Sequence, residues 1–227
     1  NAKCVRRLMR QMGLKAIYPG PKTTIRDKTR RVFPNRLKDL SVERFGQAYQ
    51  TDITYLHTSW GFLYLVALLD KCSRFVVSWR LSNSLEVRSC VDALEDACIF
   101  FGIPEIVHSD QGSQYTSGLW LEALESREIK VSMSGSGRST ENAEIERLWR
   151  SLKYEKLLVS GARSVCEVKE EVRRFMDWYN FERPHQSLGY KTPAEAAEFS
   201  GGLAPRRGPT GPKGIKRKEA KNSLISA

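Results

Sequence analysis

Apolar residues change their spacing several times along this chain, and each change marks an expected element. Three runs are rich in β-branched and aromatic side chains and are separated by short turns: residues 51–56, 61–69 and 74–81. This pattern predicts three strands in antiparallel succession. Residues 84–101 instead repeat apolar side chains at spacings of three and four. We expect a helix here, capped by Ser84 and ended by Gly102-Ile103-Pro104.

The second half of the chain alternates short apolar runs with helical patterns. Residues 105–109 and 129–133 predict two short strands, with a helix over 117–128 between them. The sequence SGSGRST at 134–140 predicts a mobile loop before a further helix that contains Glu146. Three strands followed by α, β, α, β and α is the order of a ribonuclease-H-like fold. We therefore expect an α/β protein with a mixed sheet flanked by helices.

Both ends of the chain differ from this body. Residues 2–14 carry apolar side chains at helical spacing, residues 18–45 are rich in Pro, Thr and basic residues, and residues 201–227 combine Gly, Pro and basic residues. These features predict a helix, a linker that lies along a phosphate backbone, and a disordered tail. The expected segments are an N-terminal helix with basic linker (1–45), a catalytic core (46–160), a helical extension of the core (161–200) and a disordered basic tail (201–227).

Basic residues concentrate at the two ends. Residues 1–45 hold thirteen Lys and Arg against three acidic residues, a net +10, and residues 203–227 hold seven against one, a net +6. Residues 46–202 therefore carry −5 of the total +11. An acidic body with basic arms suits a protein that binds a polyanion such as DNA. The alternative is that basic termini only keep the chain soluble.

Other classes of protein fit the composition poorly. No apolar run reaches the roughly 20 residues of a membrane span, so we expect a cytoplasmic, nucleoid-associated protein with no membrane partner. The five cysteines form no CxxC pair and the three histidines are scattered, which argues against a structural zinc site. The first residue is Asn1 rather than Met, as in a fragment of a longer chain.

Three acidic residues stand out by their settings. Asp52 lies inside an expected strand, Asp110 ends another, and Glu146 sits on a helix, with thirty-five residues between the last two. A buried carboxylate is costly unless it is paired or binds a metal, and such oxygen ligands suit Mg²⁺. Two cations about 3.5–4 Å apart can activate a nucleophile at a phosphodiester. Taken singly, either aspartate is as well explained by a turn cap or a core salt bridge.

Helix geometry separates Glu146 from its acidic neighbours. At 100° per residue one apolar stripe should face the core, made of Ile145, Leu148, Trp149 and Leu152. Glu146 borders this stripe, whereas Glu144 and Glu155 fall on the opposite side of an ideal helix. Residues that project within about 40° of Glu146 are Asn142, Arg150 and Lys153. Glu146 is therefore the residue that can face a site, and Lys153 the cation that can reach DNA beside it.

Four segments together resemble the integrase-type catalytic core of bacterial DDE transposases, specifically the insertion-sequence-three family: TDITYL, HSDQGSQYTS, ENAEIERLWRSLKYE and YNFERPHQSLGYKTPAEA. The resemblance runs from about Val5 to Phe199. It implies a ribonuclease-H-like domain in which Asp52, Asp110 and Glu146 are catalytic and bind two Mg²⁺ or Mn²⁺ ions. The implied activity is DNA strand cleavage and strand transfer without a covalent protein intermediate.

The resemblance also implies partners. They are DNA at the element ends and at the target, further copies of the chain on that DNA, and an upstream helix-turn-helix product joined by frameshifting. Lys153 matches a basic residue that often completes the family signature. The chain departs from the family pattern at Glu141, which stands for Asp, at Glu144, which replaces an often apolar residue, and at Tyr49, which replaces a common Trp.

The remaining residues of interest carry two interpretations each. The expected DNA contacts are Lys153, Arg150, Asn142 and Gln114. Gln114, with Ser113 and Tyr115, either positions a phosphate or shapes the turn after Asp110, and Asn142 either orients Glu146 or caps its helix. Packing is the favoured role of His108, Trp178 and Tyr179. The alternative functions are an inactive DNA-binding transposase remnant and a generic ribonuclease-H-like nuclease, the latter disfavoured by the RPHQSLGYKTP segment.

Overall fold

The computed structural model describes residues 1–14, 31–38, 40–135 and 142–197. The chain divides into two compact units, Asn1–Arg30 and Arg31–Ala227. In the first unit, helix α1 (Ala2–Gln11) begins at Asn1, whose side chain accepts a hydrogen bond from the Lys3 backbone N–H, and buries none of its residues. The expected disordered tail, most of the expected mobile loop and half of the expected linker lie outside the described residues.

The second unit is built on a mixed sheet with strand order β3-β2-β1-β4-β5. The five strands are β1 (Ala48–Thr58), β2 (Gly61–Asp70), β3 (Val76–Ser82), β4 (Ile106–Ser109) and β5 (Lys130–Met133). β1 pairs antiparallel with β2, and β2 pairs antiparallel with β3. On the other side of β1, β4 pairs parallel with β1 and β5 pairs parallel with β4. All five strands were predicted from the apolar pattern, although β1 extends beyond residues 51–56 at both ends.

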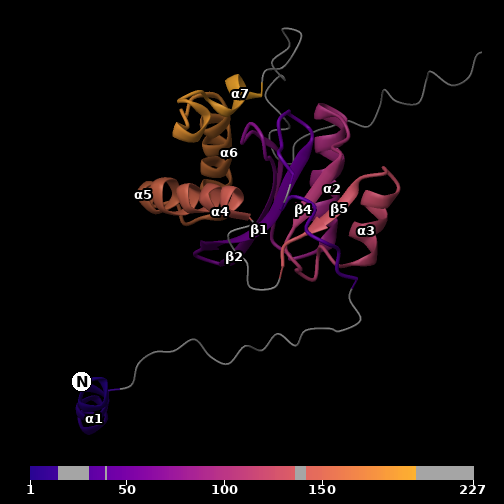
Figure 1. The fold of residues 1–227 in the computed structure, drawn as a ribbon. Helices are drawn as coiled ribbons and strands as arrows, with labels where there is room; N and C mark the ends of the chain where they lie inside the picture. The colour runs from indigo at the N-terminus through magenta and orange to yellow at the C-terminus, as the bar shows by residue number, and fades with distance from the viewer. Residues whose placement is uncertain (15–30, 39, 136–141, 198–227) are drawn as a thin grey trace, which may run out of the picture. The chain divides into compact units, whose positions relative to one another are not determined.

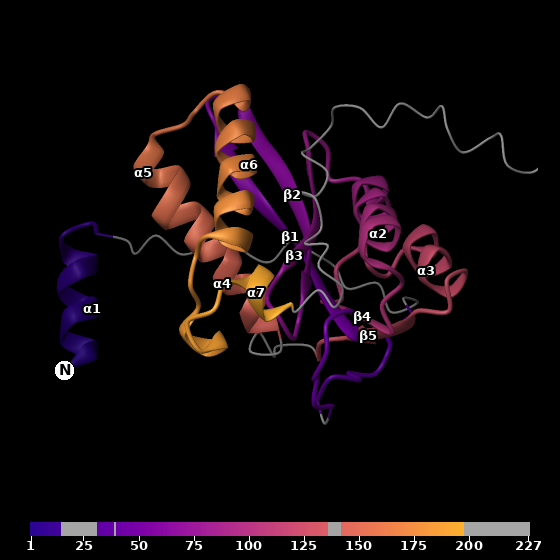
Figure 2. The same ribbon diagram turned by 90° about the horizontal axis from the view of Figure 1, so that it is seen from above.

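Helices cover both faces of this sheet (Figures 1 and 2). On one face lie α2 (Val87–Phe101) and α3 (Gly118–Glu125); on the other lie α4 (Ala143–Arg150), η2 (Ser151–Leu157), α5 (Leu158–Ser160) and α6 (Val165–Phe181). The chain continues through η3 (Gln186–Leu188) and α7 (Pro193–Ala196). Among the described residues no helix is both long and apolar enough to cross a membrane.

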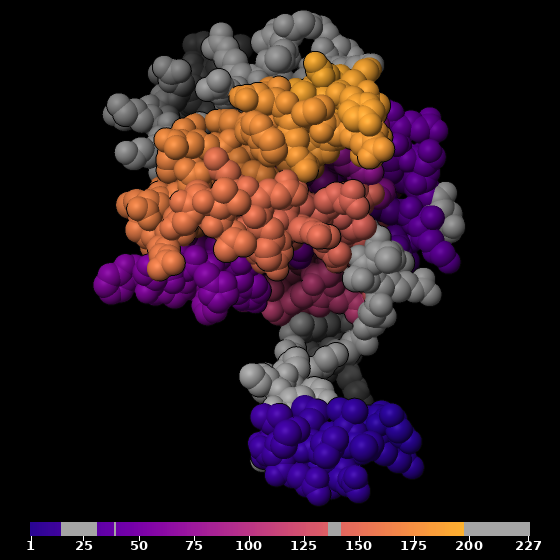
Figure 3. All heavy atoms as spheres, turned by 90° about the vertical axis from the view of Figure 1, so that its left-hand side faces the viewer, coloured from indigo at the N-terminus to yellow at the C-terminus, as the bar shows by residue number. Residues whose placement is uncertain are grey.

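Strand alternation divides the apolar side chains between two cores. Val66 and Leu68 of β2 pack with α2 and α3, whereas Leu65 and Ala67 pack with α4 and α6. Because successive side chains of a strand point to opposite faces, one sheet supplies both cores. Figure 3 shows the second face, where the orange helices lie over the sheet and the purple β1–β2 hairpin emerges beside them.

The helix that carries Glu146 is not a regular α-helix. Its middle segment, Ser151–Leu157, is π-helical, and the Leu158 backbone N–H donates to the Lys153 carbonyl five residues earlier. A π segment turns less per residue than an α-helix. Lys153 lies near the start of this segment, and its expected position nearly above Glu146 stays a prediction.

Two further expectations are corrected at element ends. Glu86 rather than Ser84 precedes the first turn of α2 and makes no side-chain cap; the Ser84 backbone N–H instead donates to the Ser82 hydroxyl. The start of α3 agrees with the sequence, since the Ser117 hydroxyl accepts from the Trp120 backbone N–H. That helix ends at Glu125, three residues before the predicted end.

The described part of the basic segment before β1 packs against the sheet. The Arg36 backbone N–H donates to the Ser132 hydroxyl (2.9 Å), and its guanidinium donates to the Val131 carbonyl (3.1 Å). Leu37 is buried in a small cluster with Ala48 and Ile106. Residues 31–38 and 40–45 are thus part of the folded body, which corrects the expectation of a linker up to residue 45.

Candidate active site

The register between β1 and β4 places two of the three carboxylates. Gln50 is level with His108 in this parallel pair, and two residues further along each strand stand Asp52 and Asp110. Neighbouring strands lie about 4.8 Å apart, so the two aspartates start from adjacent positions on two neighbouring strands. β4 ends at Ser109, whereas β1 continues to Thr58. Asp110 is therefore the first residue beyond its strand, and Asp52 lies inside its own.

Asp52 is the half-buried member of the group. The indole N–H of Trp149, on α4, donates to Asp52 Oδ2 over 2.9 Å. Burial raises the pKa of Asp52 to about 6; the hydrogen bond from Trp149 lowers it, and the negative charges of Asp110 and Glu146 raise it. Asp110 and Glu146 therefore both lie within electrostatic reach of Asp52, and a cation beside Asp52 would relieve this repulsion.

Asp110 is exposed in a tight turn. Its Oδ1 accepts a hydrogen bond from the Gly112 backbone N–H over 2.9 Å. A Cβ atom at position 112 would stand only 2.9 Å from the same oxygen, so Gly112 is the residue that leaves room for this carboxylate. The turn therefore fixes one oxygen of Asp110 and leaves the side chain open to solvent.

Glu146 is exposed on the first turn of α4. Carboxylate oxygens of this kind are the ligands that Mg²⁺ prefers. Within residues 31–38, 40–135 and 142–197, however, no group of three or more His, Cys, Asp and Glu side chains is close enough to hold a metal ion. The oxygen atoms of the three carboxylates are suitable ligands for a divalent cation, and the charges of Asp110 and Glu146 act on Asp52. The three side chains are nevertheless not close enough together in this structure to form a complete metal site.

The start of α4 is anchored by Glu144, a contact that helix geometry did not predict. Glu144 forms ion pairs with Lys71 (3.0 Å) and Arg74 (2.7 Å), and the Gln50 amide donates to its second oxygen (2.8 Å). The Glu144 side chain is only 21% exposed. The expectation that Glu144 lies on the solvent side is therefore wrong; it ties the helix of Glu146 to β1 and to the β2–β3 turn.

Glu144→Ala should destabilise the protein by about 2–4 kcal/mol, because it leaves two neighbouring cations without their shared, partly buried partner. The expected fall in melting temperature is roughly 5–15 °C for a domain of this size. Thermal unfolding checks this value. Glu155→Ala is the matched control, since Glu155 lies on the next turns of the same helix with a side chain 55% exposed. Equal losses in the two variants would contradict the anchoring role of Glu144.

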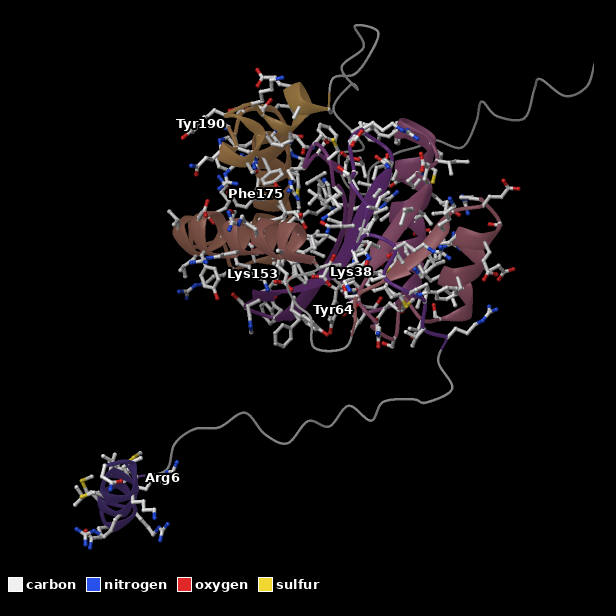
Figure 4. The ribbon with its side chains drawn as sticks, viewed as in Figure 1. Arg6, Lys38, Tyr64, Lys153, Phe175 and Tyr190 are labelled. Atoms are coloured by element: carbon white, nitrogen blue, oxygen red, sulfur yellow. The ribbon has the colours of Figure 1, made fainter. Side chains whose placement is uncertain are left out.

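The four expected DNA contacts differ in accessibility. Arg150 is exposed at the end of α4, and Lys153 (Figure 4) is half-buried; burial lowers the pKa of Lys153 and the charge of Asp52 raises it. The Gln114 amide donates to the Leu85 carbonyl over 3.3 Å. Asn142 is buried before the first turn of α4, and its side-chain oxygen has no hydrogen-bond partner in the described structure. Their contacts with DNA stay predictions.

Other residues near the motifs are structural. The Tyr115 hydroxyl is buried against the Thr51 hydroxyl at 3.1 Å, so Tyr115 does not reach a phosphate, contrary to one of its two interpretations. His108 is buried between the Ser132 and Ser134 hydroxyls, at 2.8 and 3.0 Å, which confirms packing. Tyr179 is buried as predicted, but Trp178 remains 39% exposed.

Sequence comparison gives two matches to family models, both described as integrase core domain, over residues 43–139 and 127–193. The transposase for insertion sequence element IS629 of Shigella sonnei is 34% identical over 86% of this chain and 67% of that protein. The transposase for IS904 of Lactococcus lactis is 30% identical over 88% and 81%. A putative transposase for IS986/IS6110 of Mycobacterium tuberculosis is 32% identical over 86% and 74%.

Solved structures share the fold. The catalytic core domain of HTLV-2 integrase, solved in complex with magnesium, superposes with a TM-score of 0.56 at 18% identity, over 68% of this chain and 97% of that one. A chain of the simian T-cell lymphotropic virus intasome gives a TM-score of 0.62 at 16% identity, over 76% of this chain and 60% of that one. These likenesses agree with the ribonuclease-H-like, integrase-core fold that the element order predicted.

Proposed function

Because the chain belongs to the insertion-sequence-three family of transposases, which carry an integrase core domain, we propose that it cleaves and joins DNA strands with Asp52, Asp110 and Glu146 as catalytic residues. The observation that supports this proposal is that the carboxylates of Asp110, at the end of β4, and Glu146, on α4, are both close enough to Asp52 of β1 to raise its pKa. Burial is the largest cause of the raised pKa of Asp52, and the negative charges of Asp110 and Glu146 add to it; carboxyl groups perturbed in this way cluster at functional sites.

The reaction we propose has two steps at phosphorus. Water first attacks a phosphodiester, breaks the bond to the 3′ oxygen and leaves a free 3′-hydroxyl. That hydroxyl then attacks a second phosphodiester in the target, so that one strand is joined as another is broken. Each step exchanges one phosphorus–oxygen bond for another, and no redox partner is required.

Asp52, Asp110 and Glu146 would hold the divalent cations, which we infer to be two Mg²⁺ or Mn²⁺ ions. When bound, such ions lower the pKa of water and neutralise charge on the phosphate. Trp149 orients Asp52 by its hydrogen bond to Oδ2, and the Gly112 N–H orients Asp110. Each contact fixes one oxygen of its carboxylate.

Incubation of the protein with the element's own DNA ends tests the proposal. Strand cleavage and joining should appear with Mg²⁺ or Mn²⁺ and disappear with EDTA. The alternative function, an inactive DNA-binding transposase remnant, predicts DNA binding without either product under all of these conditions.

We propose that Lys153 binds a phosphate near the scissile bond. Its ammonium is close enough to Asp52 for the charge of that carboxylate to raise the pKa of Lys153, and a lysine suits a phosphate as a compact charge on a flexible stem. Lys153→Ala should weaken binding of the element-end DNA about threefold to tenfold and slow joining, while metal affinity stays unchanged. Glu146→Gln should weaken metal binding and retain DNA binding. Titrations of DNA and of metal in both variants measure this division.

Lys156→Ala provides the matched control for Lys153→Ala, because Lys156 lies in the same π-helical segment but is paired with Glu171 at 3.0 Å. It should bind DNA like the wild type. If Lys153→Ala and Glu146→Gln lose the same function to the same extent, the proposed division of labour is wrong.

We also propose that the chain assembles as a homo-oligomer on DNA together with an upstream helix-turn-helix product. The simian viral chain of similar fold was solved within an intasome, which supports an assembly of several copies. Sedimentation of the protein with and without element-end DNA measures the stoichiometry directly.

A further inference from the structure

The β1–β2 hairpin carries a group of exposed aromatic side chains that the proposed catalytic reaction does not use. Two cross-strand pairs form it, Tyr55 with Tyr64 and His57 with Phe62, and Trp60 stands at the turn. Their ring centroids lie 5.2 Å and 4.5 Å apart, and Tyr55 contacts Phe62 diagonally at 6.2 Å. We call these five residues the hairpin aromatic surface.

This surface is open on one face only. The opposite face of the hairpin is buried against α4 and α6 through Leu56, Leu63 and Leu65. The aromatic face remains accessible, since Tyr55 is 47%, Phe62 49% and Trp60 87% exposed. Figure 4 marks the place of this surface by its label on Tyr64. Grouped exposed aromatic rings indicate a binding surface, whereas single ones do not. The edge contacts between the rings hold them in place before a ligand arrives.

The surface begins about 10 Å along β1 from the candidate active site, because Tyr55 follows Asp52 by three residues. The two side chains point to opposite faces of the strand: Asp52 faces Trp149 of α4, and Tyr55 lies on the open face. β4 ends at Ser109, so the described structure gives β1 no paired strand on that side beyond Asp52. A strand of nucleic acid that leaves the carboxylates would therefore reach the rings by crossing this unpaired side of β1.

Area favours nucleic acid over a protein partner. Residues 53–66 contain no Asp, Glu, Lys or Arg, so the rings themselves are the binding groups that this part of the hairpin offers. The exposed parts of the five side chains sum to on the order of 500 Å², below the about 800 Å² per partner of a stable protein interface. Two or three stacked bases need no larger area, and any base can stack on an aromatic ring.

We propose that the hairpin aromatic surface binds unpaired DNA bases next to the scissile phosphate by stacking. The inference rests on the proposed DNA strand-processing function, and it adds a binding site for single-stranded DNA. Stacking recognises the face of a base, which a duplex hides. The surface therefore distinguishes melted DNA at the site from paired DNA.

The test is DNA binding by the full chain in EDTA, where no chemistry occurs. Fluorescence anisotropy is measured with a labelled mixed-sequence single strand and with the same strand in a duplex. The double variant Tyr55→Leu/Phe62→Leu keeps apolar bulk but removes two rings. It should bind the single strand roughly a hundredfold more weakly, about tenfold for each lost ring, with duplex affinity and the salt slope of binding unchanged.

Two further variants keep the result interpretable. Phe100→Leu is the matched control, because Phe100 is 46% exposed at the end of α2 and should have no effect on either DNA. Trp60→Leu removes a ring from the turn without touching the packed pairs; it should also weaken single-strand binding about tenfold. If circular dichroism shows that the double variant is unfolded, Trp60→Leu decides alone.

Three results would overturn the proposal. One is unchanged single-strand binding in the folded variants, and another is an equal loss for single strand and duplex. The third is a wild-type dimer that the double variant dissociates while DNA binding persists, which would identify a protein interface. Because binding is measured without metal, an enzyme inactive in strand transfer that still shows the single-strand effect would refute the proposed function and leave this inference standing.

Discussion

Asp52→Asn, Asp110→Asn and Glu146→Gln should each lower strand cleavage and joining by at least about a thousandfold, equivalent to about 4 kcal/mol of transition-state stabilisation. Each change keeps the shape of the side chain and removes one negative charge from the proposed metal ligands. Since the three charges act together on one centre, the loss of any one should be nearly as severe as the loss of all. Gel assays of cleavage and of strand joining measure the effect.

The control for these variants is Glu155→Gln, which removes a carboxylate from the same helix outside the site. It should keep wild-type rates, and all four variants should retain binding to element-end DNA. Strand transfer at more than a tenth of the wild-type rate in one of the three triad variants would remove that residue from the catalytic set.

Asp52→Asn should also make the metal-free protein more stable at pH 7, by on the order of 2–3 kcal/mol. The reason is the raised pKa of Asp52, about 6 in the folded chain against the usual 3.8, since each pKa unit corresponds to about 1.4 kcal/mol. Asn keeps an oxygen that can accept from the Trp149 N–H but carries no charge to desolvate. Thermal unfolding in EDTA should show a rise of roughly 4–12 °C.

The pH dependence has a definite sign. Between about pH 4 and pH 6 the folded chain binds more protons at Asp52 than the unfolded chain does, so the free energy of unfolding falls as pH rises through this window. Below pH 4 the carboxyl is protonated in both states and the penalty vanishes. The advantage of Asp52→Asn should therefore be absent near pH 4 and complete above pH 6. An advantage that is equal at both ends would show that the charge of Asp52 is not its cause.

Trp149→Phe and Mg²⁺ provide independent arms of the same experiment. Phe keeps the buried ring but loses the N–H that lowers the pKa of Asp52, so Trp149→Phe should be less stable than the wild type above pH 6. Added Mg²⁺ should stabilise the wild type by mass action and leave Asp52→Asn nearly unchanged. Equal stabilisation of both proteins by Mg²⁺ would place the cation elsewhere.

Local patterns predicted the elements well because their causes are local. Period-two and period-3.6 spacing of apolar residues reflects which side of a strand or helix is buried, and this was sufficient for all five strands and for α2, α3 and the helix of Glu146. Ends were less accurate. The cap expected at Ser84 failed because its hydroxyl has an alternative partner, Ser82, and spacing alone carries no information about such competition.

The helix of Glu146 shows where an assumed geometry fails. Its apolar stripe was placed correctly at Ile145, Leu148 and Leu152, all buried. The π-helical hydrogen bonding of Ser151–Leu157 was not predicted, because the spacing of apolar residues does not distinguish it from an α-helix. Likewise an ideal helix puts Glu144 toward solvent, whereas two cations from the β2–β3 turn draw it into a part-buried ion pair.

The sequence by itself determined the order of elements, the α/β class and which three carboxylates to consider, because each follows from residue type and spacing over a few residues. Only the tertiary structure decided how those residues meet. Trp149 and Asp52 are 97 residues apart, Glu144 and Gln50 are 94 apart, and Arg36 reaches Ser132 across 96. Such contacts depend on the register of β1 against β4 and on the packing of α4 over the sheet, and no short-range periodicity specifies either.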